Sequence, residues 1–341
     1  MDIINPSTGV VISTIKSDTK KTLNSKLETL RKGHKSWTKK AIEDRLNCIK
    51  KFGELIQENK FELAQILTLE TGKPLQQSLN EIQGAQNRVD HLSQYAEQWL
   101  EPELLVDEGV TLEYIKYEPL GVIANISAWN FPYNVGYNVF LYALVAGNSV
   151  LYKPSEFATL TGKQFETYLH LAGIPKDVFK CVIGDGSLGE HILEANVNGY
   201  FFTGSHKTGL HIYKTVASKM VPVQLELGGK DPLYVSEDVV DVKQAAIIAA
   251  EGAFYNNGQS CCAIERIYIA ERIYDEFVEA FTEEVESYKI GDPNDLSTFI
   301  GSLTRAEQLG VLKVQVEDAV AKGATLLTGG NTIDCKGYYF E

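Results

Sequence analysis

The sequence predicts an α/β fold whose middle part is a doubly wound parallel sheet. From residue 119 onward, short apolar runs alternate with segments of helical length. The runs are apolar throughout and do not alternate with polar residues, as expected for parallel strands covered by helices on both faces. The predicted strands are 121–126, 148–152, 178–183, 200–202, 233–235 and 266–269. The predicted helices lie near 134–146, 159–172, 187–195, 206–219, 240–256 and 273–288.

The N-terminal third is predicted to be mostly helical over residues 18–100, because between Lys39 and Ser93 apolar residues recur at spacings of three and four among charges, which is the period of an amphipathic helix. Gly72 and Pro74 interrupt this pattern and mark a turn. Residues 110–117 are rich in β-branched and aromatic side chains, so we expect a half-exposed strand there, as one arm of a hairpin.

Two features are expected near the end of the chain. Thr304 is predicted to open a helix, because Glu307 lies three residues later and would complete a capping box. Residues 337–341 have the pattern of a strand that enters a core, and no closing helix follows them. We therefore expect a chain that is cut short rather than complete.

Composition restricts the classes of protein to consider. The chain has 341 residues, 44% hydrophobic and 23% charged, which is typical of a folded protein of two or three domains. Lys and Arg number 32 against 45 Asp and Glu, and the net charge of −13 argues against nucleic acid or an anionic membrane as the main partner. No apolar run reaches the roughly 20 residues of a membrane span, and no signal peptide is visible.

Cysteine use predicts a reduced, cytoplasmic protein. The five cysteines are odd in number and show neither a disulfide framework nor a CxxC pattern; they are Cys48, Cys181, Cys261, Cys262 and Cys335. The six histidines show no metal-binding spacing either, so no metal site is expected.

Six segments carry residues suited to chemistry, and most of them also have a structural explanation. Cys261 and Cys262 follow a glycine-containing loop after a helix, an arrangement that can present a reactive thiol to a cleft. Free cysteines, however, are more often buried fillers. Glu226 lies between leucines and before paired glycines, where burial would suit it as a general base. Alternatively, it reaches solvent or pairs with Lys230.

Two polar loops follow predicted strands. Asn130, in the segment AWNFP, lies where ligands bind open α/β sheets, and its amide can donate to a developing oxyanion. Its alternative is an amide that satisfies its own backbone. Lys153 and Glu156, in the segment KPSE, can both bind ribose hydroxyls, or they form a surface ion pair of little consequence.

Two glycine loops also join strands to helices. The segment GDGSLG at 184–189 matches GxGxxG, but no Asp or Glu follows at the expected distance of about 20 residues; Glu156 would supply that acid. The segment FTGSHKTG at 202–209 offers N–H groups at a helix start and the Ser205 hydroxyl to a pyrophosphate. Its alternative is a tight strand–helix turn.

The set of segments, taken in order, resembles the aldehyde dehydrogenase superfamily. AWNFP, KPSE, FTGS, ELGGK and FxxxGQxC follow one another along the chain, and the similarity starts at INPSTG, residues 4–9. The resemblance implies NAD-dependent oxidation of an aldehyde to a carboxylic acid through a cysteine thiohemiacetal and a thioester. By this resemblance Cys261 is the nucleophile and Glu226 the general base, and Asn130 is the side-chain half of an oxyanion hole completed by the Cys261 backbone N–H. The implied dinucleotide-binding residues are Trp129, Lys153, Glu156, Gly186, Gly204, Ser205, Gly209 and Leu227.

The resemblance also implies a domain organisation and partners. Residues 1–100 and 119–227 would form an NAD-binding domain, residues 101–118 a β-hairpin oligomerisation arm, and residues 228–341 a catalytic domain that is incomplete at its C-terminal end. A small-molecule aldehyde is the expected substrate, a homodimer or homotetramer the expected full-length assembly, and no nucleic acid or membrane partner is expected. Glu156 favours NAD over NADP, because a carboxylate accepts hydrogen bonds from the ribose 2′-OH and repels a 2′-phosphate.

Three departures from the family pattern qualify this interpretation. Ala128 replaces the usual proline before Trp129, and Val139 stands where many members carry a lysine. The chain also ends before the E-x-F-G-P segment with which the family holds the nicotinamide. The alternative is therefore a truncated member that folds and binds dinucleotide without catalysis, or one that retains only esterase activity. No residue identifies the aldehyde.

Overall fold

The computed structural model describes residues 1–341 and divides into two compact units, which we describe separately. Unit 1 comprises Met1, residues 15–63 and residues 80–226. Unit 2 comprises residues 2–14, 64–79 and 227–341. These limits differ from the domain limits expected from the sequence, because two short N-terminal segments group with the C-terminal part of the chain.

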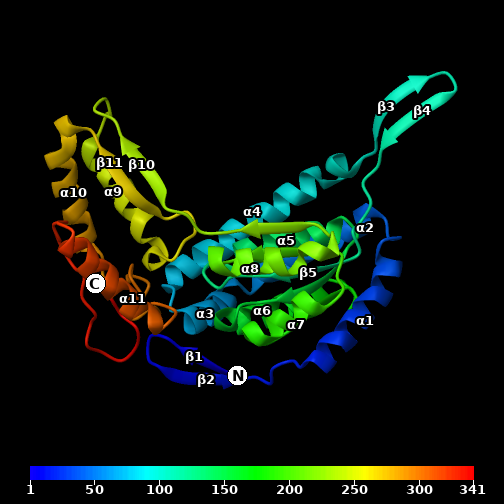
Figure 1. Ribbon diagram of the computed structural model, residues 1–341, viewed down its shortest axis with the longest axis horizontal. Helices are drawn as coiled ribbons and strands as arrows, with labels where there is room; N and C mark the ends of the chain where they lie inside the picture. The colour runs from blue at the N-terminus through cyan, green and yellow to red at the C-terminus, as the bar shows by residue number, and fades with distance from the viewer. The chain divides into compact units, whose positions relative to one another are not determined.

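Unit 1 is built on a five-stranded sheet in which every neighbouring pair of strands is parallel (Figure 1). The strand order is β7-β6-β5-β8-β9. The strands are β5 (Val122–Ile126), β6 (Ser149–Lys153), β7 (Phe179–Cys181), β8 (Gly199–Thr203) and β9 (Val223–Glu226). Since the chain proceeds outward from β5 first in one direction and then in the other, the sheet is doubly wound, and the predicted fold class is confirmed.

Helices cover both faces of this sheet. One group comprises α2 (Ile42–Glu58), α5 (Pro132–Val145) and α6 (Thr159–Leu171), which pack on one another; the other comprises α1 (Lys20–Trp37), α7 (Gly186–Glu194) and α8 (His206–Val216). Right-handed crossovers require this division, because the direction of winding reverses between β7 and β8. The turns η1 (Glu156–Ala158) and η2 (Ala217–Lys219) complete unit 1, while the residues of α3 (Lys60–Thr71) and α4 (Leu75–Leu100) are divided between the two units.

A cluster of aromatic side chains fills the core between β6 and the helices α5 and α6. The ring of Phe140 lies 5.4 Å from that of Tyr137 and 5.5 Å from those of Tyr152, Phe165 and Phe179, measured between centroids. All five side chains are buried. Edge-to-face aromatic pairs contribute about 0.5–1.5 kcal/mol each beyond their buried area. The cluster therefore fixes α5 and α6 against β6, whose end carries Lys153.

The predicted hairpin is present in unit 1 after α4. Strands β3 (Glu103–Glu108) and β4 (Thr111–Ile115) pair only with each other, in antiparallel register. Figure 1 shows them extending from the end of α4. Their apolar side chains, among them Leu104, Leu112 and Tyr114, are exposed, and a two-stranded ribbon has too little core to be stable alone.

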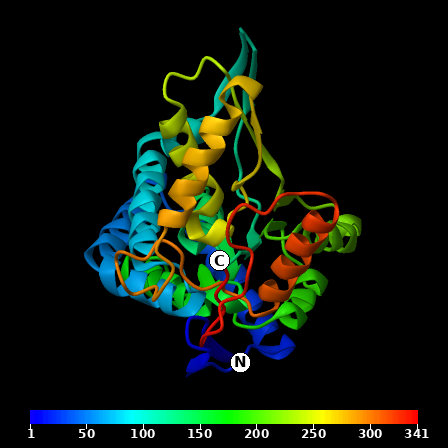
Figure 2. The same cartoon turned by 90° about the vertical axis from the view of Figure 1, so that its left-hand side faces the viewer.

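Unit 2 contains two small sheets. Strands β10 (Asp231–Val235) and β11 (Ile264–Ile269) pair in parallel. They include the two apolar runs, 233–235 and 266–269, that were predicted to be parallel strands. The helices α9 (Val242–Phe254) and α10 (Tyr274–Ser287) pack on each other around a core of Val235, Ala246, Ala249, Phe277 and Ala280 (Figure 2). The remaining elements are η3 (Tyr255–Gly258), η4 (Glu271–Ile273), α11 (Glu307–Ala321) and an antiparallel hairpin of β1 (Asp2–Asn5) and β2 (Val10–Thr14), which the sequence analysis did not predict.

The expected capping box at the start of α11 is wrong. The helix begins at Glu307 after Ala306, and no side chain caps it. The Thr304 hydroxyl instead donates to the carbonyl of Thr71 at 2.5 Å, and the Thr304 N–H donates to the side-chain oxygen of Gln259 at 3.1 Å. A tertiary partner therefore displaces the local one.

The strand expected at residues 337–341 is also wrong. This segment forms a single antiparallel bridge, between Thr332 and Phe340, and no strand. Gly337 has a φ of +98°, and the next residue, Tyr338, donates its N–H to the carbonyl of Pro6 at 3.0 Å. The segment is thus bent towards the N-terminal hairpin of unit 2 and does not extend a sheet.

Several site types receive no support from the structure. No helix is both long and apolar enough to span a membrane. No group of three or more His, Cys, Asp or Glu side chains is placed to hold a metal ion. All five cysteines are free thiols; Cys48 and Cys181 are buried, and Cys261, Cys262 and Cys335 are exposed.

Asp18 ties the start of α1 to the segment after β7. Its carboxylate accepts hydrogen bonds from Lys26 Nζ, the Ile183 N–H and the Thr22 hydroxyl, each at 2.8 Å, and its own N–H donates to the Ile183 carbonyl at 2.7 Å. Burial alone would raise the pKa of Asp18, but the hydrogen bonds from Lys26, Ile183 and Thr22 outweigh it and hold the pKa below its usual value. Folding therefore stabilises the charged carboxylate.

We expect Asp18→Asn to lower the free energy of unfolding by about 1–3 kcal/mol at pH 7, the usual loss for a hydrogen-bonded charge. Since the pKa of Asp18 is lower in the folded state, this stabilisation is present above the unfolded-state pKa of about 3.9 and is lost as pH falls through the folded-state value. The measurement is the free energy of urea unfolding of wild type and Asp18→Asn at pH 7 and at pH 3.5, where the loss should be smaller. Asp107→Asn, on the exposed hairpin, is the control. An equal loss at both pH values would contradict the assignment.

Candidate active site

Residues of unit 1 that are predicted to bind the dinucleotide or to act in catalysis follow neighbouring strands of one parallel sheet. Trp129 and Asn130 come after β5, Lys153 ends β6, Gly204 comes after β8, and Glu226 ends β9. Because all these strands point the same way, their carboxyl ends lie at one edge. The order of the strands reverses beside β5, which is where ligands bind in open α/β sheets. The fold thus brings these residues together.

Lys153 is buried at this edge, and its partner Glu156 is partly exposed. Lys153 Nζ donates to the Pro154 carbonyl at 3.3 Å and lies 4.0 Å from Glu156 Oε2. Burial lowers the pKa of Lys153, an effect that Glu156 and then Asp185 oppose. The alternative of a surface ion pair does not describe this lysine, since only 6% of its side chain is exposed.

The GxGxxG loop leads into α7, and a residue of the loop itself caps the start of that helix. Asp185 is the N-cap, and its carboxylate accepts from the Ser187 N–H at 2.9 Å. Hydrogen bonds from the side chain and backbone of Ser187 lower the pKa of Asp185, so the start of α7 already holds a negative charge. A Cβ on Gly186 would meet no other atom within 4 Å, which leaves space beside this turn.

The second glycine loop leads into α8. A Cβ on Gly204 would lie 2.4 Å from the ring of Phe202, so this close turn requires glycine. The Gly204 N–H donates to the Glu226 carbonyl at 3.0 Å and joins the ends of β8 and β9. Ser205 is the N-cap of α8, its hydroxyl accepting from the Thr208 N–H at 3.3 Å, and Gly209 is buried in the helix.

Asn130 lies in the turn between β5 and α5. Its side-chain oxygen accepts a hydrogen bond from the Phe131 N–H at 3.1 Å. The alternative expected from the sequence, in which the Asn130 amide bonds the neighbouring backbone, therefore describes the oxygen of this side chain. The first residue before α5, Phe131, provides no side-chain cap. Glu81 in α4 supplies one from a distance, because its Oε1 accepts from the Tyr133 N–H at 2.9 Å.

Glu226 is exposed at the end of β9. Its Oε1 accepts from Gln224 Nε2 at 3.4 Å. Lys230 does not pair with it and instead forms an ion pair with Glu265. The sequence suggested that burial would suit Glu226 as a base, but the side chain is not buried. Of the two alternatives, reaching solvent or pairing with Lys230, the first describes it.

Cys261 lies in unit 2, between η3 and β11. It and Cys262 are exposed, so the explanation of both as buried fillers does not apply. Partial burial, followed by the neighbouring Cys262, raises the pKa of Cys261 above its usual value. The Cys262 Sγ lies 3.3 Å from the Ser260 hydroxyl. Burial and the neighbouring Cys262 both favour the protonated Cys261 thiol over the thiolate.

Two buried polar residues near these loops were not anticipated from the sequence. Glu81 is 4% exposed and caps α5, and Gln77 is 4% exposed and hydrogen-bonds the loop that leads to Cys261. Both lie in a helical segment with the ordinary pattern of polar residues, and their partners are far away in the sequence. No local signal identifies them.

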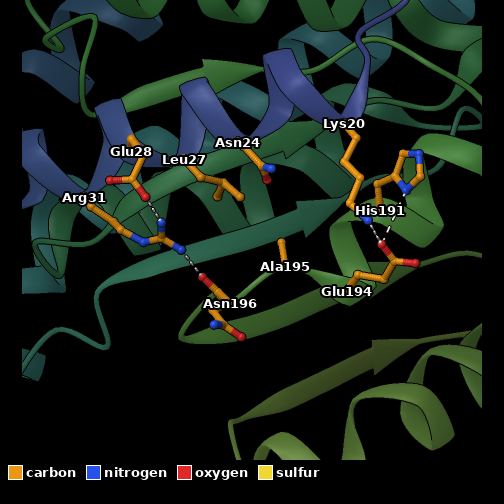
Figure 3. A pocket seen from close by; sticks show the side chains of 9 residues that line it. All are labelled: Lys20, Asn24, Leu27, Glu28, Arg31, His191, Glu194, Ala195 and Asn196. Atoms are coloured by element: carbon orange, nitrogen blue, oxygen red, sulfur yellow. Dashed lines mark hydrogen bonds and ion pairs between the residues drawn. The ribbon is translucent and has the colours of Figure 1, made fainter.

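A separate cavity of about 410 Å³ lies between α1 and the end of α7 (Figure 3). Its charged groups are already paired: Lys20 with Glu194 at 2.6 Å, and Arg31 with Glu28. Arg31 also donates to the Asn196 carbonyl at 2.7 Å. None of the residues predicted to act in chemistry lines this cavity, whose contacts join α1 to α7.

The whole chain, residues 1–341, matches the sequence profile of the family described as "Aldehyde dehydrogenase family". It is 32% identical over 336 residues to a protein named betaine aldehyde dehydrogenase from Vibrio vulnificus strain CMCP6, covering 98% of this chain and 69% of that protein.

Solved structures agree with the sequence match. A 3,6-anhydro-L-galactose dehydrogenase in complex with NAP aligns with a TM-score of 0.94 and 34% identity, covering 100% of this chain and 72% of that one. An indole-3-acetaldehyde dehydrogenase complexed with NAD+ aligns with a TM-score of 0.96 and 30% identity, covering 100% and 70%. The similarity therefore extends over both units, each of which has its counterpart in dehydrogenase structures.

We expect Glu81→Leu to lower the free energy of unfolding by about 1–2 kcal/mol, because it leaves the N–H of Tyr133 without this acceptor. Glu81→Gln retains an acceptor oxygen of the same reach and should lose less. Equilibrium unfolding of the two variants beside the wild type measures the difference. Equal stability of the two variants would show that the helix start does not depend on this cap.

Proposed function

Because the chain belongs to the aldehyde dehydrogenase family, we propose that it oxidises an aldehyde to a carboxylic acid with NAD and with Cys261 as the nucleophile. The observation that carries the proposal is the exposed thiol of Cys261, placed after the FYNNGQS loop in a chain that matches the family from its first residue to its last. A buried cysteine at this position would have argued against it.

The proposed chemistry uses three groups of this chain. Cys261 Sγ adds to the aldehyde carbon, and the carbonyl oxygen takes up negative charge in the resulting thiohemiacetal. Asn130 Nδ2 and the Cys261 backbone N–H are the donors proposed for that oxygen. Once the thiohemiacetal has lost hydride, Glu226 takes a proton from water, which attacks the thioester and releases the acid and the thiol.

The raised pKa of Cys261 gives Glu226 a possible second task. No cation contributes to the pKa of this thiol, so its proton has to be removed for the addition to occur. The exposed carboxylate of Glu226 can exchange protons with bulk water between the two steps. We propose that the same carboxylate serves the thiol first and the hydrolytic water second.

The dinucleotide is proposed to bind at the carboxyl edge of the sheet in unit 1. The donor set there suits its chemistry: Lys153 is a buried cation, Ser205 begins the eleven-residue helix α8, and Glu156 offers a carboxylate. A cation and a helix start attract phosphates, and a carboxylate accepts from ribose hydroxyls. The further residues proposed for this site are Trp129, Gly186, Gly204, Gly209 and Leu227. When bound, NAD supplies the acceptor for the hydride.

The domain roles remain part of the proposal. We assign dinucleotide binding to residues 1–100 and 119–227, catalysis to residues 228–341, and oligomer formation to the arm at 101–118. The exposed apolar side chains of the hairpin, such as Leu112 and Tyr114, support the last assignment, because a ribbon of this kind needs a partner surface to bury them.

We expect Cys261→Ala to lower NADH formation from aldehydes by about 10³-fold or more, since the covalent route is lost. Cys262→Ala, a change of the same chemistry one residue further on, should stay within about 3-fold of the wild type. The measurement is absorbance at 340 nm with a panel of aldehydes, beside ester hydrolysis without NAD. Activity that survives in Cys261→Ala would refute the assignment of the nucleophile.

Cofactor choice gives a second test. Relatives are described with NAD+ in one structure and with NAP in another, and Glu156 decides our proposal for NAD. We expect Glu156→Gln to raise the ratio of kcat/KM with NADP to that with NAD by about 10-fold, because a 2′-phosphate no longer meets a negative charge. The control is Glu190→Gln, on the exposed surface of α7. An unchanged ratio would remove Glu156 from the ribose site.

A further inference from the structure

The loop that precedes Cys261 has an unusual backbone. Asn256 has φ and ψ of 55° and 39°, and Asn257 has 57° and 32°, so two successive residues other than glycine lie in the left-handed region. Such conformations persist only where the surroundings enforce them, and they concentrate at functional sites. The question is which contacts enforce this one.

Gln77 holds the first of the two residues. Its Oε1 accepts from the Asn256 N–H at 2.9 Å, and its Nε2 donates to the Phe299 carbonyl at 2.9 Å. The side chain is buried, with 4% exposed. A single amide thus satisfies a backbone donor of the loop and a backbone acceptor of the segment beside it, both within unit 2.

The rest of the loop is attached to the same neighbouring segment. Asn257 Nδ2 donates to the Ser302 carbonyl at 2.9 Å, and Asn257 Oδ1 accepts from the Gly301 N–H at 3.0 Å. Gln259 Oε1 accepts from the Thr304 N–H at 3.1 Å, and Gln259 Nε2 donates to the Asn256 carbonyl at 3.2 Å. Asn257 and Gln259 are therefore bonded directly to residues 301, 302 and 304, and Asn256 is linked to Phe299 through Gln77.

We propose that Gln77 is a positioning residue for the reaction: through Asn256 it fixes the backbone that sets the direction of the Cys261 Sγ and of the Cys261 N–H. The proposal rests on the proposed function, in which Cys261 supplies both the nucleophile and one oxyanion donor. Gln77 is distinguished from the other contacts because it is the partner of Asn256, where the left-handed backbone begins. Without its oxygen the Asn256 N–H loses this buried acceptor, and the left-handed backbone loses one of the contacts that hold it.

The test compares Gln77→Leu with Gln77→Glu. Leu has a similar volume and removes both hydrogen bonds, whereas Glu keeps an acceptor for the Asn256 N–H and removes the amide donor to Phe299. Gln98→Leu makes the same chemical change on the exposed surface of the same helix and is the matched control. For each variant kcat, the KM for aldehyde and NAD, the melting temperature and the rate of Cys261 alkylation by iodoacetamide are measured.

We expect Gln77→Leu to lower kcat by 10- to 100-fold, the loss typical of a reacting group displaced by about 1 Å, with the KM for NAD within 3-fold of the wild type. Gln77→Glu should restore kcat to within about 3-fold of the wild type even where its melting temperature falls. Alkylation of Cys261 should change less than 5-fold in both, since the thiol stays exposed. A folded Gln77→Leu protein with wild-type kcat, or equal loss of kcat in both variants, overturns the proposal.

Two further results keep the outcome decisive. If Gln77→Leu does not fold, Gln77→Glu alone decides, because kcat below one tenth of the wild type with the acceptor retained refutes positioning through Asn256. Cys261→Ala separates this proposal from the proposed function. Turnover that persists in Cys261→Ala refutes the nucleophile, whereas turnover lost there and unchanged in Gln77→Leu refutes only the role of Gln77.

Discussion

The parallel ladder around β5 is the constraint on which unit 1 depends. β5 is bonded to β6 on one side and β8 on the other, in register over four or five residues, and its first four residues are buried. Because neighbours are parallel, their carboxyl ends must share an edge, and because the chain winds outward from β5 in both directions, the connecting segments diverge there. Lys153, the turn at Asn130 and Gly204 reach one edge for this reason alone. Their proximity needs no attraction between them.

In unit 2 the residue that we propose as the nucleophile, Cys261, belongs to a loop and not to a strand end. A loop with two asparagines in the left-handed region is costly by itself, about 1–3 kcal/mol for each such residue. Three hydrogen bonds that join Asn257 and Gln259 to residues 301–304, and the bond from the Asn256 N–H to Gln77, offset that cost. Gly301 in turn packs closely on Gly72, because a Cβ there would lie 2.2 Å from the Gly72 carbonyl oxygen. The backbone of the loop before Cys261 is thus held in place by contacts with segments that are distant in the sequence.

The sequence allowed the sheet to be predicted better than the contacts that support the site. β5 and β6 are almost entirely buried and mostly apolar, so they could be recognised as central parallel strands without knowledge of their neighbours. β9 alternates exposed and half-buried positions, so it gave no such signal, although it carries Glu226. Gln77 and Glu81 could not be predicted, because their burial is produced by loops that reach them only in the folded protein. The capping box at Thr304 was wrong for the same reason: a carbonyl 233 residues away competes for its hydroxyl.

The protonation state of Cys261 connects these observations. Low-pKa cysteines lie at helix starts or beside cations, whereas burial, Cys262 and Asp231 all raise the pKa of this one. Its reactivity then depends less on electrostatic activation than on where the sulfur and the backbone N–H point when a base is available. An exposed carboxylate such as Glu226 is suited to exchange protons with water, and a rigid loop is suited to hold the direction of attack. If Cys261 is the nucleophile that we propose, the geometry of this loop contributes what a lowered pKa contributes in other cysteine sites.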